Sequence, residues 1–147
     1  MVRNVLAVVA GFVVVGVTVA GLQWLSASLY PLPAGLDPMD PADAGALAEH
    51  TRGLPAGAWA LAFGSELLGA FLGALVAGRL ASSHRARFAL ALVALAAAAS
   101  VMNWVAFPHP VWFMVGQAVL YPVVFLGVRA FLPSDAAPDR SAASDGI

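Results

Sequence analysis

Cysteine and charged side chains are what this 147-residue chain has least of. Cysteine is absent, which excludes disulfides, thiolate metal sites and cysteine nucleophiles. Only 10% of the residues are charged and 61% are hydrophobic, whereas an average soluble domain has about 25% charged residues. A soluble protein of this size would need more polar groups to cover its surface, so the composition predicts a chain solvated by lipid. The net charge of −1 gives no reason to expect a nucleic-acid partner.

Four apolar segments are long enough to cross a bilayer, which takes about 20 residues of α-helix. They cover residues 5–29, 56–80, 88–107 and 111–131. Because lipid cannot satisfy a free sheet edge, we expect an all-α integral membrane bundle of four transmembrane helices within residues 1–132. The first segment has an alternative as a signal peptide cleaved after Ala20, but its apolar run continues to Leu29, which favours a retained span. The polar, proline-broken residues 133–147 predict a disordered cytoplasmic tail.

The basic residues predict the orientation of the chain in the membrane. All seven are arginine, and all but Arg52 would face the cytoplasm if both termini are inside. The tryptophans fall at the opposite ends of the spans, where an amphipathic ring is stable at the membrane interface. These four predicted interface anchors are Trp24, Trp59, Trp104 and Trp112. Together with a composition typical of a GC-rich bacterial genome, the pattern predicts a multi-pass bacterial inner-membrane protein with both termini cytoplasmic.

The first outer loop, residues 31–55, is long for a simple connection. Asp40 is a typical helix N-cap, Pro41 suits the first helical position, and Gly53 suits the residue after a helix. We therefore expect a short amphipathic helix in this loop, with Leu47 directed toward the membrane surface. It would cap the bundle; the alternative is a lid or a partner surface.

Glu66 is the candidate functional residue, because a carboxylate within a membrane span is costly and is retained for a reason. Small residues recur every four positions along the same span and form a ridge that favours close helix packing. The ridge consists of Ser65, Gly69, Gly73 and Ala77. Since Glu66 precedes Gly69 by three residues, we expect its side chain to face protein rather than lipid.

A carboxylate in that position either stays protonated or finds hydrogen-bond donors, and no lysine or arginine lies at its depth. At about 1.5 Å of helix rise per residue, polar side chains from the other three spans reach comparable depths. They are Gln23, Asn103, Gln117 and Tyr121. The sequence thus predicts an intramembrane polar site around Glu66. Such a network can fix helix packing, or it can bind a proton, a cation or a small polar ligand from the outer side.

Catalytic motifs are missing: the chain has no GxSxG, HExxH or P-loop, and its three histidines are scattered over loops. His109 lies between Pro108 and Pro110, which predicts an outer corner between the last two spans. We therefore expect no enzyme, no metal and no cofactor. The chain is predicted to be a structural or accessory membrane protein.

Two alternatives remain. One is a small carrier or channel, homo-oligomeric, that uses Glu66 as a protonatable site and needs an outward cavity reaching that residue. The other is a membrane enzyme acting on lipid or quinone, which needs His109 and Glu66 to converge on one pocket. Beyond the lipid bilayer, the expected partners are a second copy or another membrane subunit.

Three stretches together carry a resemblance to a known group of proteins. They are "LYPLPAGLDPMDP", residues 29–41, "GAFLGALVAGRLA", residues 69–81, and "NWVAFPHPVWF", residues 103–113. With them, residues 1–132 resemble a family of small, uncharacterised four-span bacterial inner-membrane proteins. The resemblance implies a bacterial origin and the four-span topology, and it implies no catalytic residues.

Overall fold

The protein is described from a computed structural model, which defines residues 2–134. These residues form five α-helices and one 3₁₀ helix, with no strand among them. The elements are α1 (Val2–Leu29), η1 (Pro41–Asp43), α2 (Ala44–Arg52), α3 (Ala56–Leu80), α4 (Arg85–Ala106) and α5 (Val111–Ala130). The all-α prediction is confirmed. The predicted disordered tail, apart from residues 133 and 134, lies outside the described residues.

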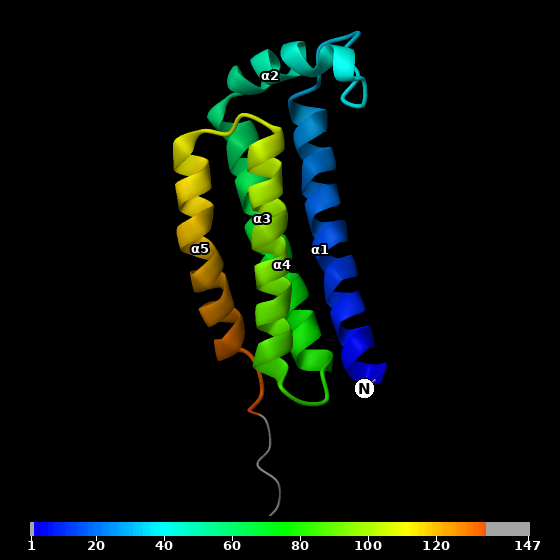
Figure 1. Ribbon diagram of the computed structural model, residues 1–147, viewed down its shortest axis with the longest axis vertical. Helices are drawn as coiled ribbons and strands as arrows, with labels where there is room; N and C mark the ends of the chain where they lie inside the picture. The colour runs from blue at the N-terminus through cyan, green and yellow to red at the C-terminus, as the bar shows by residue number, and fades with distance from the viewer. Residues whose placement is uncertain (1, 135–147) are drawn as a thin grey trace, which may run out of the picture.

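Four of the helices, α1, α3, α4 and α5, are long and apolar enough to cross a membrane. They run alternately up and down, so that the start of α1 and the end of α5 lie at one end of the bundle and α2 lies across the other (Figure 1). Helices α1 and α4 begin about one turn before the predicted apolar spans, because polar residues such as Arg3 and Arg85 extend the helices beyond their apolar parts. This fold is compatible with a multi-pass membrane protein.

Helix α3 is the centre of the bundle. It packs against α1 on one side and against α4 and α5 on the other, while α1 touches α4 only slightly. The buried core accordingly gathers around small residues of α3, and large side chains fill in from α4 and α5. Its main members are Ala70, Ala74, Ala77, Ala89, Leu92, Val93, Tyr121 and Val128. The arrangement leaves α1 attached mainly through α3, with a seam between α1 and α4.

The ridge of small residues on α3 is where α1 packs. All four ridge residues are buried. A Cβ built on Gly73 would lie 2.6 Å from the carbonyl oxygen of Gly11 and would also collide with Val15, so the two backbones are in direct contact there. The Ser65 hydroxyl donates to the Ala62 carbonyl oxygen at 2.8 Å and therefore does not obstruct the contact. The absence of a side chain at Gly69 and Gly73 is what allows the close approach.

The segment between α1 and α3 contains the expected short helix, with a different beginning. The Asp40 carboxylate accepts from the Ala42 amide at 2.9 Å, but it caps the 3₁₀ turn η1 rather than α2. Helix α2 follows from Ala44 and ends at Arg52, where the Gly53 amide donates to the His50 carbonyl at 3.0 Å.

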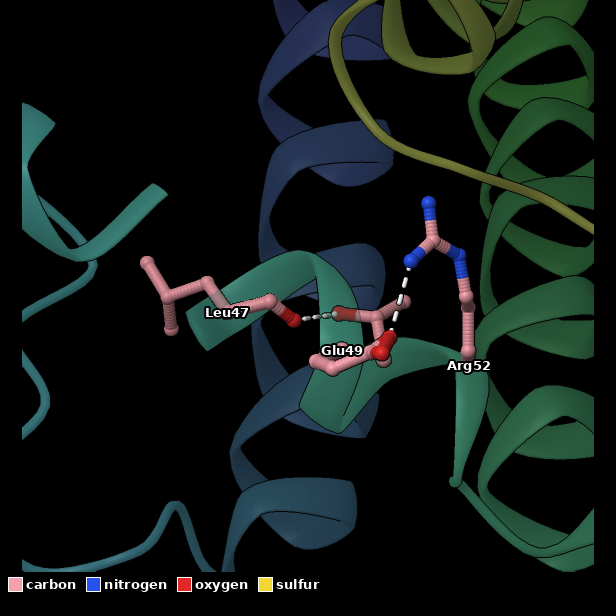
Figure 2. A network of polar contacts seen from close by, with 4 residues as sticks. Leu47, Glu49 and Arg52 are labelled. Carbon is pink, nitrogen blue, oxygen red and sulfur yellow. Dashed lines mark hydrogen bonds and ion pairs between the residues drawn. The ribbon is translucent and has the colours of Figure 1, made fainter. Parts of the chain in front are cut away.

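Side chains of α2 make their polar contacts within the helix. Arg52 pairs with Glu49 at 2.8 Å (Figure 2). The Thr51 hydroxyl donates to the Leu47 carbonyl oxygen at 2.7 Å. The ion pair is exposed, so it adds little stability.

The end of the bundle opposite α2 carries the arginines of the described chain other than Arg52. Two of them tie helices together there: Arg3 donates to the Leu80 carbonyl oxygen at 3.0 Å, and Arg79 donates to that of Phe131 at 3.4 Å. The α3–α4 turn is held by Asn4, whose side-chain oxygen accepts from the Ser82 amide at 2.9 Å. The two ends therefore differ strongly in charge, as the sequence analysis expects.

Candidate functional site

Glu66 lies near the middle of α3, half-buried, and its carboxylate is turned toward α4 and α5. The side chain thus faces protein. It does not share a partner with the ridge, however: Gly69 and Gly73 contact α1, whereas the hydrogen bonds of Glu66 go to the other two helices. Three residues along an α-helix turn the direction of a side chain by about one sixth of a circle, which separates the two faces.

Three donors surround the carboxylate. Its Oε2 accepts a hydrogen bond from the Ser100 hydroxyl and another from the Gln117 amide at 3.0 Å. Its Oε1 accepts one from the Asn103 amide, at the longer distance of 3.4 Å. Hydrogen bonds to a charged group contribute about 1.5–3 kcal/mol each. The hydrogen bonds are thus divided unequally between the two carboxylate oxygens. Oε2 accepts two, whereas Oε1 accepts one long hydrogen bond and can accept more.

The donors are themselves oriented by a second layer of hydrogen bonds. The Trp104 indole, which can only donate, bonds to the side-chain oxygen of Gln117 at 3.0 Å. This fixes the Gln117 amide with its nitrogen toward Glu66. The Tyr121 hydroxyl lies 2.6 Å from that of Ser100. Since the one hydrogen of Ser100 goes to Glu66, Tyr121 is the donor in that pair. The result is a chain of hydrogen bonds that converges on one carboxylate.

Three of the four predicted partners of Glu66 thus lie in this network: Asn103 and Gln117 bond to it directly, and Tyr121 acts through Ser100. Gln23 of α1 lies beside the carboxylate, lining the same cavities, but within residues 2–134 it makes no hydrogen bond to the network. Helix α1 therefore contributes a wall of the site rather than a donor.

Ser100 is a partner of Glu66 that was not predicted from the sequence. It lies in the run "LAAAASVMNW", where a serine is easily taken for one more small packing residue. The signal was its spacing: Ser100 precedes Asn103 by three residues, so the two share a helix face.

The four tryptophans divide into two kinds. Trp24 and Trp112 are 73% and 53% exposed, as residues at a membrane interface would be. Trp59 is only 8% exposed, with its ring 5.5 Å from that of Phe113 in an edge contact. Its ring therefore faces the interior of the bundle, and its role as an interface anchor stays a prediction. Trp104 is half-buried and serves as a donor to the polar network.

His109 occupies the corner between α4 and α5. Its Nδ1 lies 2.8 Å from the carbonyl oxygen of Phe107, and its ring stands 5.4 Å from Trp59 and 4.9 Å from Phe113. A carbonyl can only accept, so the hydrogen-bonded nitrogen carries the proton. The ring is thereby fixed in the aromatic corner.

A cavity of about 310 Å³ connects the α2 end of the bundle with Glu66. We refer to it as the outer cavity. Its walls come from α1, α2, α3, α4 and the turn after α4, and include Gln23, Tyr30, Thr51, Glu66, Asn103 and His109. Glu66 and His109 thus line one cavity, the arrangement that the membrane-enzyme alternative requires. None of the described residues that line it is an arginine.

Among residues 2–134 no group of three His, Asp or Glu side chains is arranged to hold a metal ion. The architecture and the site together define an all-helical chain, compatible with a multi-pass membrane protein, with a hydrogen-bonded carboxylate open to one end. Comparisons of the chain with protein families, with curated proteins and with solved structures find no match.

Proposed function

We propose that the protein is a small membrane carrier that binds a cation at Glu66, in exchange for a proton, from the end of the bundle covered by α2. The observation that carries the proposal is the outer cavity, which extends from α2 to the carboxylate. A purely structural or accessory protein, the role the sequence favours, would have a closed bundle around a fully satisfied network. The open cavity favours the carrier instead.

The chemistry of the site indicates the charge of the ligand. Oε1 of Glu66 accepts only one long hydrogen bond from the described residues, so it is the atom free to accept from a ligand. The absence of arginine from the described lining disfavours an anion, since burying two negative charges together is costly. The site is formed within one chain, so the proposal does not need a second copy, although a homo-oligomer is compatible with it.

The setting of this carrier follows from the charge pattern. The arginines of the bundle gather opposite α2, and the positive end of a membrane protein faces the cytoplasm. We propose that both termini are cytoplasmic, that the outer cavity opens to the other side, and that the membrane is a bacterial inner membrane. The resemblance to four-span bacterial proteins supports this placement.

The test is proton flux in liposomes. Reconstituted protein would be challenged with a panel of cations while the internal pH is recorded. Wild type is expected to show cation-dependent proton release that Glu66→Gln abolishes, because glutamine keeps the shape and cannot exchange a proton. Glu49→Gln, which removes an exposed carboxylate of α2, is the matched control and should leave flux unchanged. No flux from wild type, or equal flux from Glu66→Gln, would refute the carrier.

A further inference from the structure

A second cavity adjoins Glu66 and differs in character from the outer cavity. It measures about 330 Å³ and lies along the seam where α1 and α4 barely touch. We refer to it as the lateral groove. Away from Glu66 its walls are apolar and include Phe12, Val15, Val19, Ala96 and Ala99. Phe12 and Ala99 are exposed, so the groove opens on the apolar flank of the bundle.

The two cavities meet at the polar site. Gln23, Glu66 and Asn103 line both of them. From Gln23 to Phe12 the groove follows α1 for about 16 Å by helix rise. A molecule with its head at Glu66 therefore has a polar chamber on one side and a long apolar channel on the other.

We propose that the ligand of this site is an amphiphilic cation with a single alkyl chain, its ammonium at Oε1 of Glu66 and its chain in the lateral groove. The inference rests on the proposed function for the positive charge of the head group. It adds an alkyl chain to the ligand, and it adds a route of entry, from the lipid through the side of the bundle. The groove supplies apolar walls that replace lipid around the chain. Apart from Gln23 and the hydrogen-bonded network, both at the Glu66 end, the groove offers no polar side chain to a ligand.

The structure provides a variant that fills the groove without disturbing the packing of α1 on α3. Gly16 lines the groove, and a Cβ built on it meets no atom within 4 Å, unlike one built on Gly11, five residues earlier. Gly16→Leu should therefore occupy the channel and leave the bundle intact. Gly21→Leu is the matched control: it lies on the same helix, has the same free space, and does not line the groove.

Binding would be measured by equilibrium dialysis of methylammonium and dodecylammonium against the full chain in lipid nanodiscs, with empty nanodiscs subtracted. Dodecylammonium is expected to bind at a lower concentration than methylammonium, because its alkyl chain leaves water for the bilayer and for the apolar walls of the groove. Gly16→Leu should weaken the binding of dodecylammonium at least tenfold and leave the binding of methylammonium unchanged. Gly21→Leu should change neither, and Glu66→Gln should abolish both.

The outcomes separate the two proposals. If Gly16→Leu leaves dodecylammonium binding unchanged, or weakens both ions equally, the groove is not the site of the chain and this inference is overturned, while the Glu66 carrier stands. If neither ion binds in a way that depends on Glu66, both proposals fail. Ala99→Leu, on the α4 wall of the groove, repeats the test from the opposite side and should give the same selective loss.

Discussion

The contact between α1 and α3 should tolerate no side chain at Gly73, and this is the sharpest stability prediction of the structure. A Cβ there would lie 2.6 Å from the Gly11 carbonyl oxygen and against Val15, and a backbone atom cannot rotate away as a flexible side chain can. Gly73→Ala therefore forces the two helices apart. Gly64→Ala introduces the same methyl group on the same helix at an exposed position where a Cβ meets nothing within 4 Å.

The expected difference is large enough to measure. Overpacking a well-packed contact costs about 1–3 kcal/mol, and the two rigid backbones place Gly73→Ala toward the upper end of that range. Gly64→Ala should change stability by less than about 1 kcal/mol, the difference in helix propensity between glycine and alanine. The free energy of unfolding therefore falls for Gly73→Ala only.

The assay is reversible unfolding in mixed detergent micelles, followed by helix content, with both variants and wild type measured side by side. Since α1 is attached mainly through α3, Gly73→Ala should also make α1 the first helix to become accessible to proteolysis. Equal stability of Gly73→Ala and Gly64→Ala would show that the ridge is not in backbone contact with α1, and the packing described above would be wrong.

Two further predictions concern the polar network and the orientation. Trp104→Phe removes the donor that orients Gln117 and should lower the free energy of unfolding by about 1 kcal/mol, whereas Trp112→Phe, at an exposed position, should not; similar losses in thermal melting would count against the network. In intact cells, a cysteine at Ala46 of α2 should react with a membrane-impermeant thiol reagent, and one at Ser83, between α3 and α4, should not; the reverse pattern would invert the proposed topology.

The number of helices and their approximate limits could be predicted from the sequence, because apolar length is a local property of the chain. The start of α2 could not: Asp40 has the residue type of a helix cap, but whether the turn after it is 3₁₀ or α depends on contacts such as that of the Asp37 amide with Asp43. The chemistry of the cap was predictable, and the length of the turn was not.

The polar site was only partly predictable, for a related reason. Helix rise places Gln23, Asn103 and Gln117 at similar depths, but depth says nothing about rotation around each helix axis. Rotation decides that Gln117 bonds to Glu66 while Gln23 only lines the cavities beside it. The same limit explains Trp59, which has the depth of an interface residue and the direction of a core residue.

The seam between α1 and α4 was beyond the reach of sequence reasoning. A pattern of four spans suggests a bundle in which each helix packs equally against its neighbours. Here α3 is central, and α1 packs mainly against α3. Both cavities follow from that arrangement, since an evenly packed bundle would leave α1 in contact with α4. The function proposed for Glu66 therefore depends on a tertiary feature rather than on a motif.

The most direct test of the account asks whether water reaches Glu66 from the α2 end. The chain has no cysteine, so a single introduced thiol is the only one to react. Ala62 lines the outer cavity one turn from Glu66, whereas Ala74 is fully buried in the core. The measurement is the rate at which Ala62→Cys and Ala74→Cys react with a small, positively charged methanethiosulfonate. The cysteine thiolate attacks the reagent in water, forms a mixed disulfide and displaces methanesulfinate. The account predicts rapid reaction at position 62 and none at 74; protection of both would contradict it.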